Sequence, residues 1–257
     1  MRSKLIILGC GSSLGVPRID GYWGKCKKNN KRNIRTRSSA IIIKGSNNIL
    51  IDASPDIKNQ FLKNNIKNIS SVIFSHEHAD QTNGLFELRP FFWKNKSKIN
   101  IYGNNKTIHY LKIRHGYLFK NKKNYPAILN ANIIKKSTFS LGSSKEKILF
   151  NTINSKHGAT HSVVYIFEKA AYISDTNDLS LAKNDRLKNL NYLIIDCLKY
   201  KKHPSHFNLN ESLYVHDQLK PKKTILTNLH HDIDYDQLYK KLPKNVIPAY
   251  DGLSIKL

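Results

Sequence analysis

Short apolar runs rich in Ile, Leu and Val recur along this 257-residue chain, and they restrict its fold more than any other feature. Each run has the length of a buried strand. They span residues 4–8, 39–44, 48–51, 71–74, 99–102, 147–150, 162–167, 170–173, 192–198, 223–226 and 252–256. The helix candidates between them are 56–64, 105–114, 210–219 and 234–242. Grouped strands with interspersed helices, and no long linker or repeat, predict one layered α/β domain over residues 1–257.

The composition is that of an ordinary globular protein, but the charge is unusual. Lys and Arg number 43 against 18 Asp and Glu, which gives a formal net charge of +25. Such a charge is typical of proteins that bind nucleic acid or another polyanion. The alternative is compositional drift, because AT-rich codons encode Lys, Asn and Ile together. We favour drift, since no helix candidate concentrates its lysines on one face.

Neither a targeting segment nor a membrane span stands out in the sequence. The first apolar run is only Leu5 to Leu8 before glycines interrupt it. No stretch approaches the roughly 20 apolar residues needed to cross a bilayer. We therefore expect a cytoplasmic protein without a membrane partner. Its cysteines, Cys10, Cys26 and Cys197, are far apart and odd in number, so they form no disulfide framework.

A glycine-rich loop, "GCGSSLGVP", follows the first predicted strand and comes close to the dinucleotide-binding pattern G-x-G-x-x-G. Its third glycine, Gly15, is one place late, and Pro17 follows where a helix should continue. No acidic residue ends the next strand. A turn at the edge of a site, with backbone N–H groups available to a phosphate, fits the residues equally well.

The stretch "SVIFSHEHADQTNGL" carries the clearest chemical signal. His76 and His78 follow a buried strand at alternating positions, which places both imidazoles on the same side of an extended turn. Two imidazoles so placed can share one cation. The pair by itself is equally consistent with two structural histidines, so its interpretation depends on the rest of the chain.

Other polar side chains lie at the ends of predicted strands. Asp52 ends "NILID", where it can accept a hydrogen bond from the histidine turn. His157 and Asp175 end later strands, and His203 and His206 occur in "KKHPSHF". Each of them alone is most simply structural. Together they supply imidazole and carboxylate groups from several strand ends, as a hydrolytic metal site requires.

The ordered set "SHEHAD", "HG", "YISDT", "HPSHF" and "AYDG" resembles the metallo-β-lactamase-fold hydrolases. The resemblance is strongest to the branch of the phosphoribosyl cyclic phosphate phosphodiesterase of the phosphonate pathway. It covers nearly the whole chain, from "GCGSSLGVPRIDGYWGKC" to "PAYDGLSI". It implies a four-layer αββα sandwich with the site at one edge, between the two sheets.

The resemblance also implies a ligand pattern, H-x-H-x-D-H. The residues carried over are His76, His78 and His157 for a first metal, Asp175 as a bridge, and Asp80 for a second metal. The family places two more histidines on the second metal, one directly after that aspartate and one near the C-terminus.

This chain has amides at both of those positions, Gln81 and Asn228. Amide oxygens are poor ligands for zinc or manganese compared with imidazole. Since both losses fall on one site, we predict one divalent metal, zinc or manganese, beside an eroded second site. A small shift of the loop would bring in His230 or His231 as substitutes. The family histidine matching His231 helps hold a structural zinc with cysteines, of which only Cys26 remains, so no structural zinc is expected.

The first functional hypothesis is a metal-dependent hydrolase of a small phosphodiester or cyclic phosphate. Asp80, released from a second metal, would orient or deprotonate the attacking water, and the resemblance assigns His206 as general acid. A second hypothesis, motivated by the charge, is a nuclease of the same fold. A third is a non-catalytic relative that binds a ligand in the old cleft, motivated by the lost histidines.

The sequence says least about contacts with the substrate and with other protein chains. The basic segment 25–37 is a candidate flap over the cleft that would bring Arg35 or Arg37 to a substrate phosphate, with His203 as a further contact. Members of the family often pair, so a homodimer is a further expectation, although nothing in the sequence marks an interface.

Overall fold

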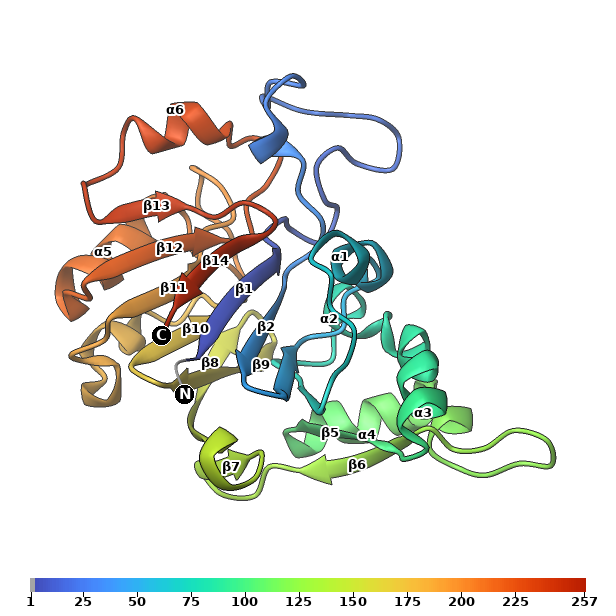
Figure 1. Cartoon of the computed structure of the whole chain (residues 1–257). Coiled ribbons are helices and arrows are strands. Elements are labelled where there is room, and N and C mark those ends of the chain that lie inside the picture. The colour runs from blue at the N-terminus through green and yellow to red at the C-terminus, as the bar shows by residue number, and fades with distance from the viewer. Residues whose placement is uncertain (1–2) are drawn as a thin grey trace.

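Two sheets stacked face to face form the centre of the computed structural model, which describes residues 3–257 (Figure 1). Strands of the first sheet lie in the order β14 (Leu253–Lys256), β1 (Lys4–Gly9), β2 (Ser39–Lys44), β3 (Asn47–Ile51), β4 (Ser71–Ile73), β5 (Ile99–Gly103) and β6 (Leu129–Ile133). Those of the second lie in the order β13 (Val246–Pro248), β12 (Lys223–Thr227), β11 (Tyr192–Asp196), β10 (Ala170–Ile173), β9 (Thr160–Phe167), β8 (Ile148–His157) and β7 (Thr138–Leu141).

Helices flank both sheets. The α-helices are α1 (Ile57–Lys63), α2 (Ala79–Thr82), α3 (Arg89–Asn95), α4 (Asn105–Arg114), α5 (Leu209–Leu219) and α6 (Tyr235–Tyr239). Short 3-10 turns occur at η1 (Lys31–Asn33), η2 (Leu85–Leu88), η3 (Gly116–Leu118), η4 (Ser144–Glu146), η5 (Leu179–Lys183) and η6 (Asp185–Leu187). Helix α5 begins with a capping box between Asn208 and Glu211, which satisfies the first free N–H groups of the helix.

Three apolar cores lie between the layers. Successive side chains of a strand point to opposite faces of its sheet and so contribute to two different cores. In β1, Leu5 and Ile7 point between the sheets, while Ile6 and Leu8 face the helices on the outer side of the first sheet. A third core joins the second sheet to α5 and α6. A strand whose side chains are buried on both faces of its sheet needs another layer of structure on each side. The predicted four-layer αββα fold is therefore confirmed.

Strand direction brings the chemically interesting residues to one edge. β3 and β4 are parallel, as are β10, β11 and β12. β8 runs in the same direction as β10, because both are antiparallel to β9. The carboxyl ends of parallel strands lie at the same edge of a sheet. Asp52, His76, His157, Asp175 and Asn228 all occur at or just after such ends.

The structure extends or adds several elements relative to the sequence prediction. The runs 147–150 and 162–167 are parts of a longer hairpin, β8 and β9, because the polar alternation in "NTINSKH" hides the rest of β8. Strands β6, β7 and β13 and helices α2 and α3 are short or polar and were not predicted. After β1 the glycine loop enters no helix; Gly11 instead makes β-bridges to Arg37 and Leu229. Within residues 3–257, no helix combines the length and apolar character that a bilayer crossing requires.

Candidate functional site

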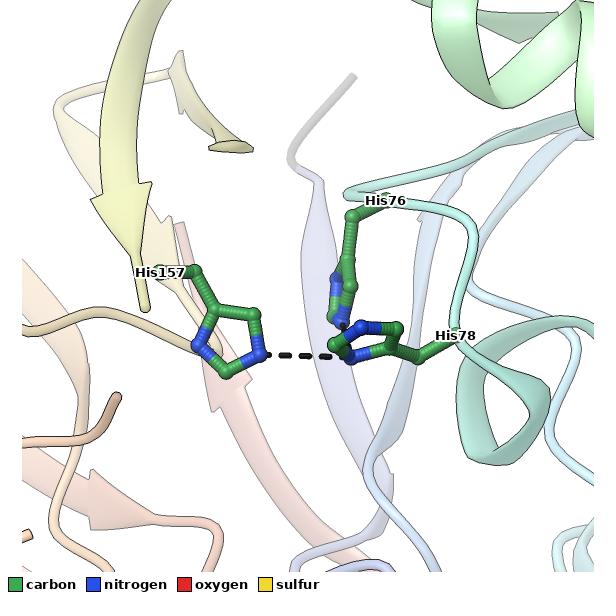
Figure 2. A group of neighbouring side chains, drawn as sticks. All are labelled: His76, His78 and His157. Carbon is green, nitrogen blue, oxygen red and sulfur yellow. Dashed lines mark hydrogen bonds between the residues drawn. The ribbon is translucent and has the colours of Figure 1, made fainter. Parts of the chain in front are cut away.

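Three imidazoles from two different sheets face one another at the shared edge (Figure 2). His76 and His78 lie in the turn between β4 and α2, and His157 ends β8. His76 Nε2 is 2.9 Å from His78 Nδ1, which in turn is 3.3 Å from His157 Nε2. The first two histidines are close in the sequence, whereas the third lies beside them only because the two sheets are stacked.

Hydrogen bonds at the far side of two rings fix which nitrogen faces the cluster. His157 Nδ1 donates to the carbonyl of Ser205 at 2.7 Å, which leaves a lone pair on Nε2. His76 Nδ1 is 2.9 Å from the hydroxyl of Ser75, which donates to Asp52 at 2.9 Å. Asp52 also accepts from the Ser75 backbone N–H at 2.7 Å. It therefore supports the histidine turn from behind, as predicted, but does so through Ser75.

This donor set fits one divalent cation. Zinc–nitrogen bonds of roughly 2.0–2.1 Å in a tetrahedral site place ligand nitrogens about 3.3 Å apart, close to the spacing of these rings. Asp175 Oδ2 is 3.8 Å from His76 Nε2 and 3.7 Å from His157 Nε2. Burial, together with the neighbouring His157 and His78, holds the pKa of His76 well below its ordinary value. The ring is consequently neutral and free to bind a metal.

The second-metal positions present N–H groups where imidazole lone pairs would be needed. Gln81 Nε2 lies 3.2 Å from Asp80 Oδ2 and 3.5 Å from Asp175 Oδ1. Asn228 Nδ2 lies 3.2 Å from Asp196 Oδ1. Gln81 Oε1 is buried and meets no donor within residues 3–257, so this position offers a cation one neutral oxygen. Amide groups at these two positions are poorer ligands for zinc or manganese than imidazole.

His206 forms a hydrogen-bonded dyad with Asp196, a residue that sequence reasoning missed. His206 Nδ1 is 2.9 Å from Asp196 Oδ2, and its Nε2 is 3.8 Å from Asp175 Oδ2. Burial lowers the pKa of His206, but the charge of Asp196 and the hydrogen bond to it, together with Asp175 and Asp80, raise it to about 9. The available signal was that "YLIID" ends in an acid, as "NILID" does at Asp52.

Asp80 stands between the cluster and a pocket. Its carboxylate accepts from Gln81, and both Asp80 and His206 line a pocket of about 210 Å³ next to the histidines. Burial and the charge of Asp175 raise the pKa of Asp80. A carboxyl group with a raised pKa beside a protonated imidazole is an arrangement suited to proton transfer.

The structure does not place Arg35 or Arg37 on the cleft. Arg35 is 1% exposed, and its guanidinium donates to the His230 carbonyl at 3.2 Å and to Asn33 at 3.1 Å. Arg37 pairs with Asp56 at 2.7 Å. Segment 25–37 is no flap, because hydrogen bonds tie it to the strand-to-helix segment before α6. His203, by contrast, lines the pocket beside His206.

The predicted substitute ligands lie apart from the three-histidine cluster. The rings of His230 and His231 are 3.6 Å apart between centroids, and His230 Nδ1 is 3.2 Å from Asp232. His231 packs edge-on against Tyr22, with 5.2 Å between ring centroids. His230 lines the pocket. The two rings form a separate group with Asp232.

Comparison with known proteins gives matches along the whole chain. The pattern of the Beta-lactamase superfamily domain matches residues 47–230. Among solved structures, the chain is similar to a diphosphatase from the PhnP family, with 29% identity, a TM-score of 0.87, and coverage of 100% of this chain and 98% of that one. It is also similar to zinc-bound PqqB from Methylobacterium extorquens, with 15% identity, a TM-score of 0.77, and coverage of 99% and 100%.

One curated relative is an octanoyltransferase from Porphyromonas gingivalis (strain ATCC BAA-308 / W83). It is 28% identical over 255 residues, which are 97% of this chain and 51% of that protein. The chain therefore spans about half the length of this relative.

Proposed function

From the match of residues 47–230, the chain belongs to the Beta-lactamase superfamily domain family, and on that premise we propose that it hydrolyses a small phosphodiester or cyclic phosphate with one divalent cation. The resemblance to metallo-β-lactamase-fold hydrolases of the PhnP branch is confirmed. Similarity to a PhnP-family diphosphatase supports phosphoryl chemistry. The observation that carries the proposal is the convergence of three imidazole nitrogens beside a charged histidine and two carboxyl groups.

His76, His78 and His157 would hold the cation, with Asp175 beside them. When bound there, a divalent cation polarises a phosphoryl oxygen and lowers the pKa of a water molecule from 15.7 toward about 7. Imidazole ligands suit zinc, and manganese accepts them with carboxylates, so both remain in the proposal.

The remaining chemistry belongs to the side chains of this protein. Asp80 accepts the proton of the attacking water. His206, protonated and held by Asp196, donates its Nε2 proton to the leaving oxygen. Its proton faces inward because Nδ1 is engaged by Asp196 at 2.9 Å. The amides of Gln81 and Asn228 hold the surrounding carboxylates in place, where a second cation would otherwise lie.

Acyl transfer through a cysteine nucleophile, which the name of the curated relative raises, is disfavoured by the cysteines of this chain. Cys10, Cys26 and Cys197 are at most 5% exposed. Burial raises the pKa of all three thiols, that of Cys197 to about 12. A nucleophilic cysteine needs an accessible thiolate, which these positions disfavour.

The first experiment is elemental analysis of the protein purified without chelator and then loaded with zinc or manganese. We expect about one metal per chain, lost in His78→Ala, and hydrolysis of bis(p-nitrophenyl) phosphate that falls by more than about a hundredfold in His76→Ala. His109→Ala, at an exposed position of α4, is the matched control and should keep both properties.

Two results would count against this function. A chain that holds no metal after loading would favour the non-catalytic relative. Hydrolysis that survives His76→Ala would show that the observed activity does not depend on the histidine cluster.

A further inference from the structure

Glu77 has no role in the proposed hydrolysis, although it lies between two of the three clustered histidines in the sequence. Side chains alternate along an extended segment, so Glu77 points away from the side on which His76 and His78 approach each other. It is nevertheless only 5% exposed. We infer that Glu77 is a positioning residue that sets where the His76–His78 pair lies relative to His157; the inference rests on the proposed function for the cation that these rings would hold.

The segment that carries the histidine pair, residues 75–78, lies beyond the end of β4. Two contacts hold it to its own sheet and to α2: Asp52 accepts from Ser75, and Thr82 donates to the last carbonyl of the segment at 2.8 Å. A backbone contact reaches the other sheet, from the Val163 N–H of β9 to the Ser75 carbonyl at 2.8 Å. A single hydrogen bond of this kind fixes the start of the segment but leaves the rest free to pivot.

The carboxylate of Glu77 supplies a further contact with the other sheet. Its Oε1 accepts from the hydroxyl of Thr160, in β9, at 2.8 Å. Lys106 Nζ, in α4, lies 2.7 Å from the same oxygen and donates to the Thr160 hydroxyl at 2.6 Å, while Thr107 donates to Oε2 at 3.4 Å. The Lys106 side chain is 61% exposed, so solvent screens its ion pair. Thr160 is buried, and its hydrogen bond to a carboxylate is of the stronger, charge-assisted kind, so it constrains the segment more.

The strand register ties Thr160 to the third histidine. Thr160 pairs with His157 in the β8–β9 hairpin. Residues paired across antiparallel strands lie about 4.5–5.5 Å apart between their Cα atoms. The hydrogen bond between Glu77 and Thr160 thus joins the direct neighbour of two rings to the direct partner of the third. Metal–ligand distances tolerate errors of only about 0.2 Å. A small pivot of the segment would therefore move two ligand nitrogens out of reach of a cation held by His157.

Another side-chain hydrogen bond between the sheets offers a matched comparison. The Tyr165 hydroxyl, also in β9, donates to the Phe74 carbonyl at 2.7 Å, and both residues are fully buried. Phe74 is held in its own sheet as well, because its N–H donates to the Tyr102 carbonyl at 2.8 Å. Loss of the Tyr165 hydroxyl should therefore lower stability without moving the histidine pair. Thr160→Val and Tyr165→Phe each remove one buried hydroxyl from the same strand and leave the charge unchanged.

The test is titration of the metal-free protein with cobalt(II), followed by the visible absorption of the bound ion, which reports the geometry of its ligands. We expect Glu77→Ala and Thr160→Val to bind cobalt roughly ten- to a hundredfold more weakly than wild type, and with altered band positions. Tyr165→Phe should match wild type in both respects. Glu77→Gln keeps an oxygen that can accept from Thr160, so it should recover most of the affinity lost in Glu77→Ala.

Urea denaturation of the metal-free variants separates positioning from stability, because Thr160→Val and Tyr165→Phe should lose similar amounts of stability. Unchanged cobalt binding in Thr160→Val would overturn the inference, and so would equal losses of cobalt affinity in Thr160→Val and Tyr165→Phe. Thr160→Val also decides the case in which Glu77→Ala does not fold. Cobalt binding needs no turnover: the expected pattern in a protein that hydrolyses no phosphodiester supports the inference and defeats the proposed function, whereas hydrolysis beside unchanged cobalt binding in Glu77→Ala does the opposite.

Discussion

The side-chain amides of Gln81 and Asn228 set the electrostatic environment of the carboxylates around them. Asp80, Asp175 and Asp196 each have an amide nitrogen of Gln81 or Asn228 within 3.5 Å. Amide donors stabilise the carboxylates less than a divalent ion would, which leaves more negative charge near His206. That charge is one reason for the raised pKa of this histidine.

The pH dependence of hydrolysis follows from this raised pKa. In the proposed mechanism His206 donates a proton, which requires its protonated form, and neighbouring carboxylates raise its pKa to about 9. Activity should therefore fall as the pH rises through that value, whereas the acid limb should reflect protonation of Asp80, the proposed base, whose pKa is also raised. In Asp196→Asn the charge that raises the pKa is removed, so the alkaline limb of kcat/KM should move toward the ordinary value near 6.5. The measurement is a pH–rate profile of both proteins.

Asp185→Asn is the control for this profile, since the Asp185 side chain is 85% exposed and lies on η6, away from the site. Its alkaline limb should match that of wild type. An unmoved limb in Asp196→Asn would mean that another group donates the proton.

Among the elements, segment 25–37 is anchored to the start of α6 by the buried carboxylate of Asp234. Asp234 accepts from the Lys27 N–H at 3.0 Å, the Asn33 amide at 2.7 Å and the Gln237 N–H at 3.1 Å. Cys26 Sγ also contacts the carbonyls of His231 and Ile233. In Figure 1 the blue N-terminal loop accordingly lies beside the red segment that enters α6. The carboxylate joins the N-cap of α6 to a segment about 200 positions earlier in the sequence.

Asp234→Ala should destabilise the fold by about 2–3 kcal/mol, because it leaves buried donors without a partner. Burial raises the pKa of Asp234, but the Lys27, Gln237 and Asn33 hydrogen bonds lower it, and the net direction is downward. The stabilisation is thus present above the unfolded pKa near 3.9 and is lost as the pH falls through the lower folded value. Urea denaturation at pH 7 and pH 3 measures both effects.

The matched variant is Asp236→Ala, which removes an exposed carboxylate that accepts from Asn30. It should cost less than about 0.5 kcal/mol. Equal losses in the two variants would show that Asp234 does not anchor the segment.

At the scale of the whole molecule, the net charge of +25 should attract polyanions such as RNA. We expect single-stranded RNA to bind without base preference and to lose at least about a hundredfold in affinity between 50 and 200 mM salt. It should not be cleaved under conditions in which the phosphodiester is hydrolysed, since the pocket has no stacking surface. Fluorescence anisotropy and gel electrophoresis measure these properties. Cleavage that disappears in His76→Ala would favour the nuclease hypothesis instead.

Much of the fold can be predicted from the sequence, because a strand buried on both faces appears as a short continuous run of apolar residues. The run "SAIIIK" predicts β2 to the residue, and "YLIIDCL" predicts β11 with an overrun of two residues. The length of β8 was underestimated, because most residues of its second part, "NTINSKH", are polar and several of them are exposed or only partly buried. α2 is only one turn long, and its start at His78 carries no side-chain cap. Such elements owe their existence to neighbours that are distant in sequence.

By itself, the sequence determined the layered α/β class, the His76–His78 pair and the acids Asp52 and Asp175 that follow buried strands, because spacing along a strand or turn is local. Only the tertiary structure decided which of these groups meet. His206 reaches Asp196 through a loop between β11 and α5, and Arg35 turns inward to the His230 carbonyl instead of toward the cleft. The direction of a long side chain depends on contacts across the chain, which composition and periodicity do not encode. The same holds for the pocket, whose walls at Ser12 and Lys199 are far apart in the sequence and meet only because the two sheets are stacked with their site edges together.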